Sequence, residues 1–172
     1  MELKNLFGLP AHPLVVHLPI VLIPLVSIGA VAIVAVPRWR ARIGWILVAL
    51  AGVALVGVQL AIGSGEALQD YVDRSAALRR HTELAESLRP LALLLLVALL
   101  ALMLLERARA RGGSPRAAHL RWSLPLAGVV LVVASVVSTI RLVQVGHNGA
   151  RASWGRVNLD TPHRVSGGGD RD

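Results

Sequence analysis

The chain has 172 residues, of which 55% are hydrophobic and 16% charged, and its mean hydropathy is +0.63. Soluble domains carry about 25% charged residues and cannot bury this much apolar surface. The composition therefore excludes an ordinary soluble enzyme, a secreted disulfide scaffold and a disordered chain. The sequence contains no cysteine, which also excludes thiolate ligands, iron–sulfur clusters and disulfides. A polytopic membrane protein remains.

The formal net charge of +8 is unevenly distributed along the chain. Two short stretches, 37–42 and 106–121, hold a large share of the arginines, and long apolar runs flank both. This pattern is typical of the cytoplasmic loops of a membrane protein, whereas a nucleic-acid-binding protein gathers its positive charge on one soluble face. We therefore expect no nucleic-acid partner. The arginines of the two stretches are Arg38, Arg40, Arg42, Arg107, Arg109, Arg111, Arg116 and Arg121.

Four apolar segments are long enough to cross the hydrocarbon core, which takes about 20 helical residues. The sequence predicts an all-α, four-transmembrane-helix bundle within a domain over 8–155 and a flexible tail over 156–172. It shows no internal repeat and predicts no pair of broken helices, so a transporter is not favoured. The predicted helices are 13–36, 43–63, 83–106 and 121–146.

Topology follows from the arginine bias. The two arginine-rich loops are expected in the cytoplasm, so both termini and the connection over 63–89 are expected outside a bacterial inner membrane. The tryptophans agree, because Trp39, Trp45 and Trp122 fall at the predicted inner interface, where aromatic side chains gather. We expect a multi-pass protein whose first partner is the lipid bilayer.

Polar side chains near the predicted spans collect at the outer end of the bundle, where each needs a partner or a wet cavity. Three histidines are predicted to form one site: His17, His81 and His147. His12 is expected to be peripheral, because it lies five positions before His17, or about 140° around a helix. The other members of the predicted cluster are Glu66, Glu86 and Arg141, and Arg141 is expected to pair with one of these carboxylates or with a bound anion.

The segment Ala11-His12-Pro13-Leu14-Val15-Val16-His17-Leu18-Pro19-Ile20 resembles the H-P-x-x-V-H-x-P motif of the domain-of-unknown-function 2231 family. Three segments are similar to that family in the same order: Gly63-Ser64-Gly65-Glu66, Arg80-His81-Thr82-Glu83-Leu84-Ala85-Glu86 and Gly146-His147-Asn148-Gly149-Ala150, followed by Trp154. The resemblance covers about residues 8–155. It implies a small four-helix bacterial inner-membrane protein with hallmark positions at His12, Pro13, His17 and Pro19. It implies no biochemical activity.

Three hypotheses for function remain open. The first is binding of haem b, with His17, His81 and His147 as candidate ligands and Arg141 near the propionates, in a redox-linked protein with a membrane redox partner. The second is a zinc or copper site. The third is a non-catalytic accessory or scaffold subunit, or a homo-oligomer, whose polar cluster only locks the bundle. No catalytic residue is predicted. The candidate metal ligands are His12, His17, His81, His147, Glu66 and Glu86.

Overall fold

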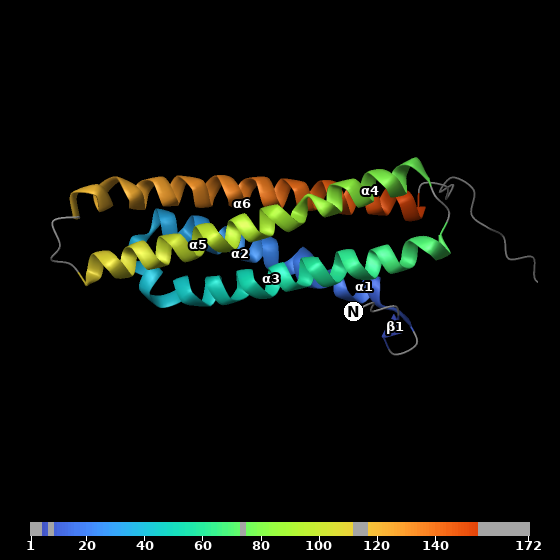
Figure 1. Cartoon of the computed structure of the whole chain (residues 1–172), viewed down its shortest axis with the longest axis horizontal. Coiled ribbons are helices and arrows are strands. Elements are labelled where there is room, and N and C mark those ends of the chain that lie inside the picture. Colours follow the sequence, from blue (N-terminus) through green and yellow to red (C-terminus); the bar gives the residue numbers. More distant parts are fainter. Residues whose placement is uncertain (1–4, 7–8, 73–74, 112–116, 155–172) are drawn as a thin grey trace, which may run out of the picture.

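The computed structural model describes residues 5–6, 9–72, 75–111 and 117–154, and its helices lie side by side in an elongated bundle (Figure 1). Four helical stretches are long and apolar enough to cross a membrane, so the predicted all-α, four-span architecture is confirmed. The predicted tail over 156–172 lies outside the described residues. A two-stranded antiparallel hairpin precedes the bundle. In chain order the elements are β1 (Asn5–Leu6), β2 (Leu9–Pro10), α1 (Ala11–Val15), α2 (His17–Ala35), η1 (Pro37–Trp39), α3 (Arg40–Leu68), η2 (Gln69–Tyr71), α4 (Ala76–Glu86), α5 (Leu88–Ala110) and α6 (Ala117–Trp154).

The first and third spans are each divided into two helices. Val16 separates α1 from α2, and Ser87 separates α4 from α5. A proline follows three residues after each junction, at Pro19 and Pro90. Proline has no N–H to donate to the carbonyl four residues earlier, so the helix loses a hydrogen bond at each junction. Val16 and Ser87 both keep helical backbone angles, so each junction is a local irregularity within one membrane span.

The two halves of the chain are built alike. Each begins with a short helix and a break, continues into a long helix, and returns through a second long helix (Figure 1). In the bundle, α2 and α5 each pack against both α3 and α6. The fold therefore repeats its supersecondary structure, although no repeat is visible in the amino-acid sequence.

Apolar side chains fill the bundle in two clusters stacked along its axis. One surrounds Leu99 and Leu131 and lies toward the arginine-rich loops. The other surrounds Ile23 and Val58 and lies toward the opposite end, below the junctions of the broken helices. Hydroxyl groups link α2 to α6 inside this core, because Ser27 Oγ donates to the carbonyl of Ser135 at 3.2 Å. Such bonds between membrane helices hold neighbouring helices in register.

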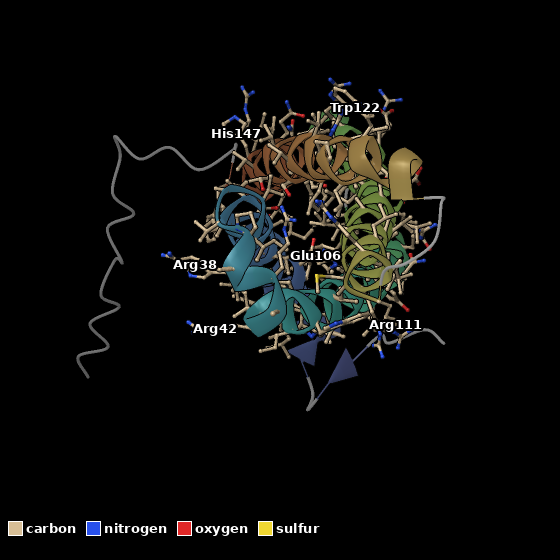
Figure 2. The ribbon with its side chains drawn as sticks, turned by 90° about the vertical axis from the view of Figure 1, so that its left-hand side faces the viewer. Arg38, Arg42, Glu106, Arg111, Trp122 and His147 are labelled. Atoms are coloured by element: carbon tan, nitrogen blue, oxygen red, sulfur yellow. The ribbon has the colours of Figure 1, made fainter. Side chains whose placement is uncertain are left out.

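The two ends of the bundle differ in chemistry. One end holds η1, the C-terminal end of α5 and the N-terminal end of α6, whereas α1, α4 and the last turns of α6 lie at the other (Figure 1). At the arginine-rich end, Arg40 donates to Glu106 at 2.9 Å and caps the carbonyl of Ile33 at 2.9 Å. Figure 2 looks onto this end and shows Arg38 and Arg42 pointing outward, while Glu106 points toward the bundle interior.

Candidate functional site

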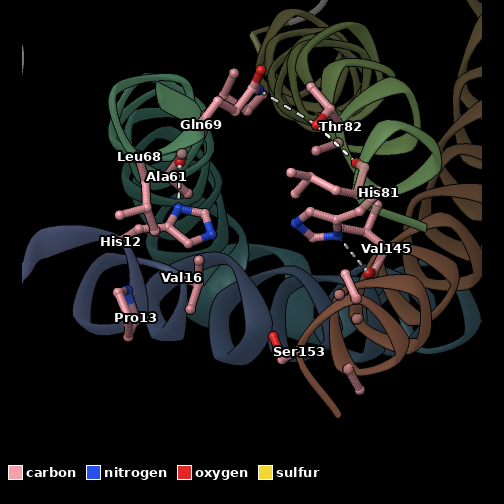
Figure 3. A pocket seen from close by; sticks show the side chains of 18 of the residues that line it. His12, Pro13, Val16, Ala61, Leu68, Gln69, His81, Thr82, Val145 and Ser153 are labelled. Atoms are coloured by element: carbon pink, nitrogen blue, oxygen red, sulfur yellow. Dashed lines mark hydrogen bonds between the residues drawn. The ribbon is translucent and has the colours of Figure 1, made fainter. Parts of the chain in front are cut away.

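A cavity of about 810 Å³ opens at the end of the bundle opposite the arginine-rich loops. Its walls come from α1, α4 and the C-terminal turns of α3 and α6. Most of the lining is apolar, including Ile20, Val58 and Leu142. This size and lining are typical of pockets that hold a cofactor or a small ligand. Two histidines, one from each half of the chain, stand on opposite walls (Figure 3).

His12 is held in one orientation by α3. Its Nδ1 lies 2.9 Å from the carbonyl oxygen of Ala61 and 3.3 Å from Oγ of Ser64. Because a carbonyl only accepts hydrogen bonds, Nδ1 is the protonated nitrogen of the ring. In the neutral imidazole Nε2 then keeps a free lone pair, the arrangement that metal-ligating histidines use.

His81 is held by α6 in the same manner. Its Nδ1 lies 2.9 Å from the carbonyl oxygen of Val145, so Nδ1 again donates, and in the neutral ring Nε2 keeps its lone pair. The acceptors for both histidines are main-chain carbonyls of the returning helices. Each half of the fold thus presents one imidazole with the same nitrogen free.

The two rings face each other across the cavity. Their centroids are 6.4 Å apart and their planes make an angle of 85°. Figure 3 shows the Nε2 edges of His12 and His81 turned toward one another, away from the hydrogen-bonded Nδ1 atoms. This arrangement leaves two nitrogen lone pairs converging on the space between the rings.

Two glycines provide the room for the imidazoles. Gly65 comes one helical turn after Ala61, and Gly149 one turn after Val145. A Cβ atom at Gly65 would lie 3.1 Å from Cε1 of His12, and one at Gly149 would lie 3.0 Å from Cε1 of His81. Each ring therefore packs against a position where a side chain would crowd it. These glycines were not singled out from the sequence as site residues, although both lie in the segments that carried the family resemblance.

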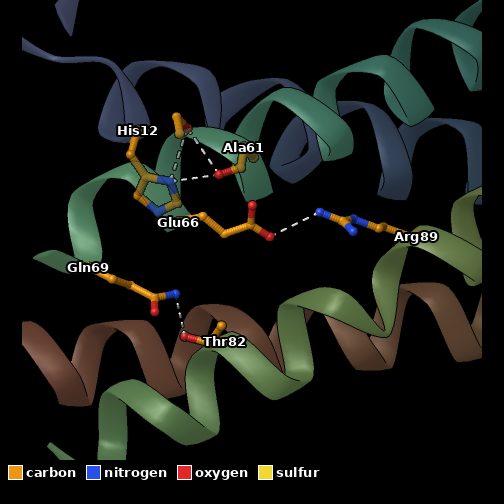
Figure 4. Close-up of polar contacts among 7 residues, drawn as sticks. His12, Ala61, Glu66, Gln69, Thr82 and Arg89 are labelled. Atoms are coloured by element: carbon orange, nitrogen blue, oxygen red, sulfur yellow. Dashed lines mark hydrogen bonds and ion pairs between the residues drawn. The ribbon is translucent and has the colours of Figure 1, made fainter. Parts of the chain in front are cut away.

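Polar contacts join neighbouring helices at the rim of the cavity (Figure 4). Glu66 accepts from Arg89 at 3.2 Å, which joins α3 to α5. Gln69 Nε2 donates to the hydroxyl of Thr82 at 3.4 Å, which joins the end of the second span to α4. Arg151 also lines the cavity, and its exposed guanidinium adds a positive charge there.

The structure brings together a different set of residues from the one predicted. His12, which was expected to be peripheral, faces His81, so this expectation was wrong. His17 and His147 are exposed and do not line the cavity. Figure 2 shows His147 on the outside of the bundle. A three-histidine site of His17, His81 and His147 is therefore not what the fold assembles.

Of the three charged residues in the predicted cluster, one lines the cavity and two do not. Of these, Glu66 lines the cavity, whereas Glu86 is exposed and off its wall. Arg141 is half-buried on α6 and does not line the cavity. The expected pairing of Arg141 with Glu66 or Glu86 is not formed, because Glu66 pairs with Arg89 and no ion pair joins Arg141 to either carboxylate in the described residues.

The start of the first helix explains why His12 and not His17 reaches the site. The sequence argument began the helix at about residue 13, with His12 at its cap. The structure instead begins α1 at Ala11, so His12 lies within a helix that packs against α3. Val16 keeps helical backbone angles, and His17 lies about 140° further around the axis, on an exposed face.

The described residues contain no cluster of side chains with enough ligands for a typical metal site. In that part of the chain, no group of three or more histidine, cysteine, aspartate or glutamate side chains is placed to hold a metal ion. Tetrahedral zinc sites take three or four protein ligands.

One family model matches most of the chain, over residues 8–158, and its description is "Predicted membrane protein (DUF2231)". The match spans all four helical stretches and includes both histidines of the cavity. No curated protein and no solved structure matches the chain.

Proposed function

The chain belongs to the DUF2231 family of membrane proteins, and we propose that it binds a b-type haem between His12 and His81. The observation that carries this proposal is the pair of imidazoles whose Nε2 atoms converge while both Nδ1 atoms donate to main-chain carbonyls. Haem iron in electron-transfer proteins takes axial ligands from facing helices, and bundle cores supply them.

The spacing of the rings supports two ligands on one metal ion. A metal–imidazole nitrogen bond is about 2.0–2.1 Å long, so two trans imidazoles have ring centres roughly 6 Å apart. The observed separation between the centroids of His12 and His81 is 6.4 Å. An edge-to-face contact between two rings also falls in this range, so the proposal depends on the two free Nε2 atoms as well as on the distance.

The surroundings suit a macrocycle with an apolar body and a charged edge. The cavity volume of about 810 Å³ is within the range of cofactor pockets, and most of its lining is aliphatic. Arg151 at the rim is the residue we assign to a propionate, in place of Arg141. Glu66 is already neutralised by Arg89, so it does not oppose a bound anion with its full charge.

Bound haem would supply one-electron transfer, with the potential set by the axial ligands and by the burial of the group. The protein's own contribution is to orient two imidazoles, to exclude water with aliphatic side chains and to balance the propionate charge. The site lies at the end expected to face outside the inner membrane. A redox partner would therefore approach from that side.

A zinc or copper ion is the second candidate, because the same two lone pairs could bind it. With only His12 and His81 as nitrogen ligands, water or Glu66 would have to complete the coordination. The third candidate is a scaffold role, in which the hydrogen bonds to Ala61 and Val145 lock the two halves together.

An absorption spectrum and a metal analysis of one detergent-purified sample separate these candidates. We expect a Soret band at about one haem per chain, either as purified or after titration with haemin. Zinc or copper near one equivalent without a Soret band supports the second candidate. A sample that takes up neither haem nor metal rejects the haem proposal and leaves the scaffold role.

Four histidine variants provide the matched comparison. His12→Ala and His81→Ala each remove one facing imidazole and are expected to abolish the Soret band. His17→Ala and His147→Ala change exposed rings off the cavity and are expected to leave it intact. Loss of haem in His17→Ala or His147→Ala, with retention in His12→Ala, would contradict the assignment of the ligands.

A further inference from the structure

A second hollow lies at the opposite, arginine-rich end of the bundle. It is a groove of about 550 Å³ along α6, bounded by the end of α2 and by the first residue of α3 and the last turn of α5. Its walls are branched aliphatic side chains, among them Val34, Val129 and Val133. Gly128, which has no side chain, lies at the floor of the groove, where an added Cβ would meet Val34 at 3.3 Å.

Two arginines from different helices line this apolar groove. Arg40 is only 13% exposed and is committed to Glu106 and to the carbonyl of Ile33. Arg109, on the last turn of α5, is exposed and makes no ion pair within the described residues. The groove therefore combines aliphatic walls with one positive charge that no carboxylate neutralises.

We infer that this groove binds an anionic phospholipid of the surrounding bilayer. The acyl chain would lie along the valines of α6, and the headgroup phosphate would pair with Arg109. A basic pocket between membrane helices at the arginine-rich side is the chemistry that holds phospholipid headgroups. The inference does not depend on the haem site, which is at the other end of the bundle.

Charge complementarity selects this occupant over an uncharged lipid. Three other arginines of this end point outward in Figure 2 and do not line the groove, namely Arg38, Arg42 and Arg111. They attract anionic headgroups in general, as positive charges near a membrane surface do. Arg109 differs because its guanidinium adjoins a preformed apolar slot, so that one lipid molecule can satisfy both parts of the site.

The test is the thermal stability of the detergent-purified full chain with added lipid. Phosphatidylglycerol is the anionic probe and phosphatidylcholine the zwitterionic control. At a lipid concentration tenfold above the Kd, we expect phosphatidylglycerol to raise Tm by about 3–6 °C. Phosphatidylcholine is expected to produce less than half of this rise.

Arg109→Gln and Arg111→Gln form a matched pair. Both remove one positive charge from the end of α5, but only Arg109 lines the groove. We expect Arg109→Gln to lose most of the phosphatidylglycerol effect while its lipid-free Tm stays close to that of the unchanged chain. Arg111→Gln is expected to keep the effect.

Three results would overturn the inference. Equal stabilisation by the two lipids would show that the phosphate charge is not recognised. Equal losses in Arg109→Gln and Arg111→Gln would show a general surface attraction and no groove. Stabilisation by inorganic phosphate to the same extent would show that the anion alone binds and that the apolar slot has no part.

Discussion

His12 and His81 face each other with ring centroids 6.4 Å apart, although they come from opposite halves of the chain. Each is fixed by a hydrogen bond from Nδ1 to a carbonyl of a returning helix, at 2.9 Å in both cases. The short helices that carry the two histidines pack against the returning helices, α1 against α3 and α4 against α6. This packing places the two rings at the same end of the bundle.

The glycines beside the rings are expected to control ligand binding without controlling the fold. Alanine at Gly65 or Gly149 places a Cβ about 0.3–0.4 Å inside ordinary contact with an imidazole carbon. The ring must shift, so we expect haem content to fall severalfold in Gly65→Ala and Gly149→Ala. The ratio of Soret to protein absorbance measures this change.

Gly52 and Gly63 are the controls, because a Cβ at either position meets nothing within 4 Å and neither residue lines the cavity. Alanine in a helix is more favourable than glycine by about 0.5–1 kcal/mol. Gly52→Ala and Gly63→Ala are therefore expected to keep the ligand and to raise Tm slightly. If they lose haem to the same degree as the other pair, crowding of the imidazoles is not the cause.

The ion pair at the opposite end is expected to stabilise the fold. Arg40 is mostly buried and bonds both to Glu106 and to the end of α2. Arg40→Gln leaves the carboxylate unpaired and is expected to cost about 1–2 kcal/mol, or a drop in Tm of about 2–8 °C. Arg42→Gln, at an exposed arginine on the same helix, is expected to change Tm by less than half of that.

A double variant tests whether the two groups act as a pair. Arg40→Gln combined with Glu106→Gln removes both charges at once, so the second substitution is expected to cost less than it does alone. Additive losses in Tm would contradict a direct interaction between the two side chains.

Arg141 is expected to be dispensable for stability. It is half-buried on α6 and has no carboxylate partner within the described residues. A long arginine side chain can extend its guanidinium toward the interface, and a charge within the hydrocarbon is costly. Arg141→Leu is therefore expected to leave Tm in detergent unchanged or higher. A decrease of more than about 4 °C would show that the guanidinium has a structural partner.

The orientation across the membrane is a further prediction, with both termini outside. A fluorescent reporter that matures only in the cytoplasm should be dark when fused after Asp172. The same reporter fused after Arg111, at the end of α5, should be bright. The reverse pattern would place the His12–His81 cavity on the cytoplasmic side and the arginine-rich groove outside.

Hydropathy and charge were sufficient to predict the four membrane spans and to predict which loops and helix ends lie at the same end of the bundle. An apolar run of the right length has one stable solution in a bilayer, a helix, because every backbone group must bond internally. The arginine-rich loops therefore had to alternate with the His-containing ends. The same reasoning correctly brought His81 and Glu66 to one end of the bundle.

The members of the site were decided by tertiary structure alone. Whether His12 or His17 faces inward depends on where the first helix begins and on which of its faces packs against α3, and proline near the start of a helix is compatible with either arrangement. The fit of the rings against Gly65 and Gly149 depends on how closely α1 and α4 approach the returning helices. Spacing along one helix determines which residues share a face, but contacts between helices determine which faces meet, because packing joins residues that are distant in the chain.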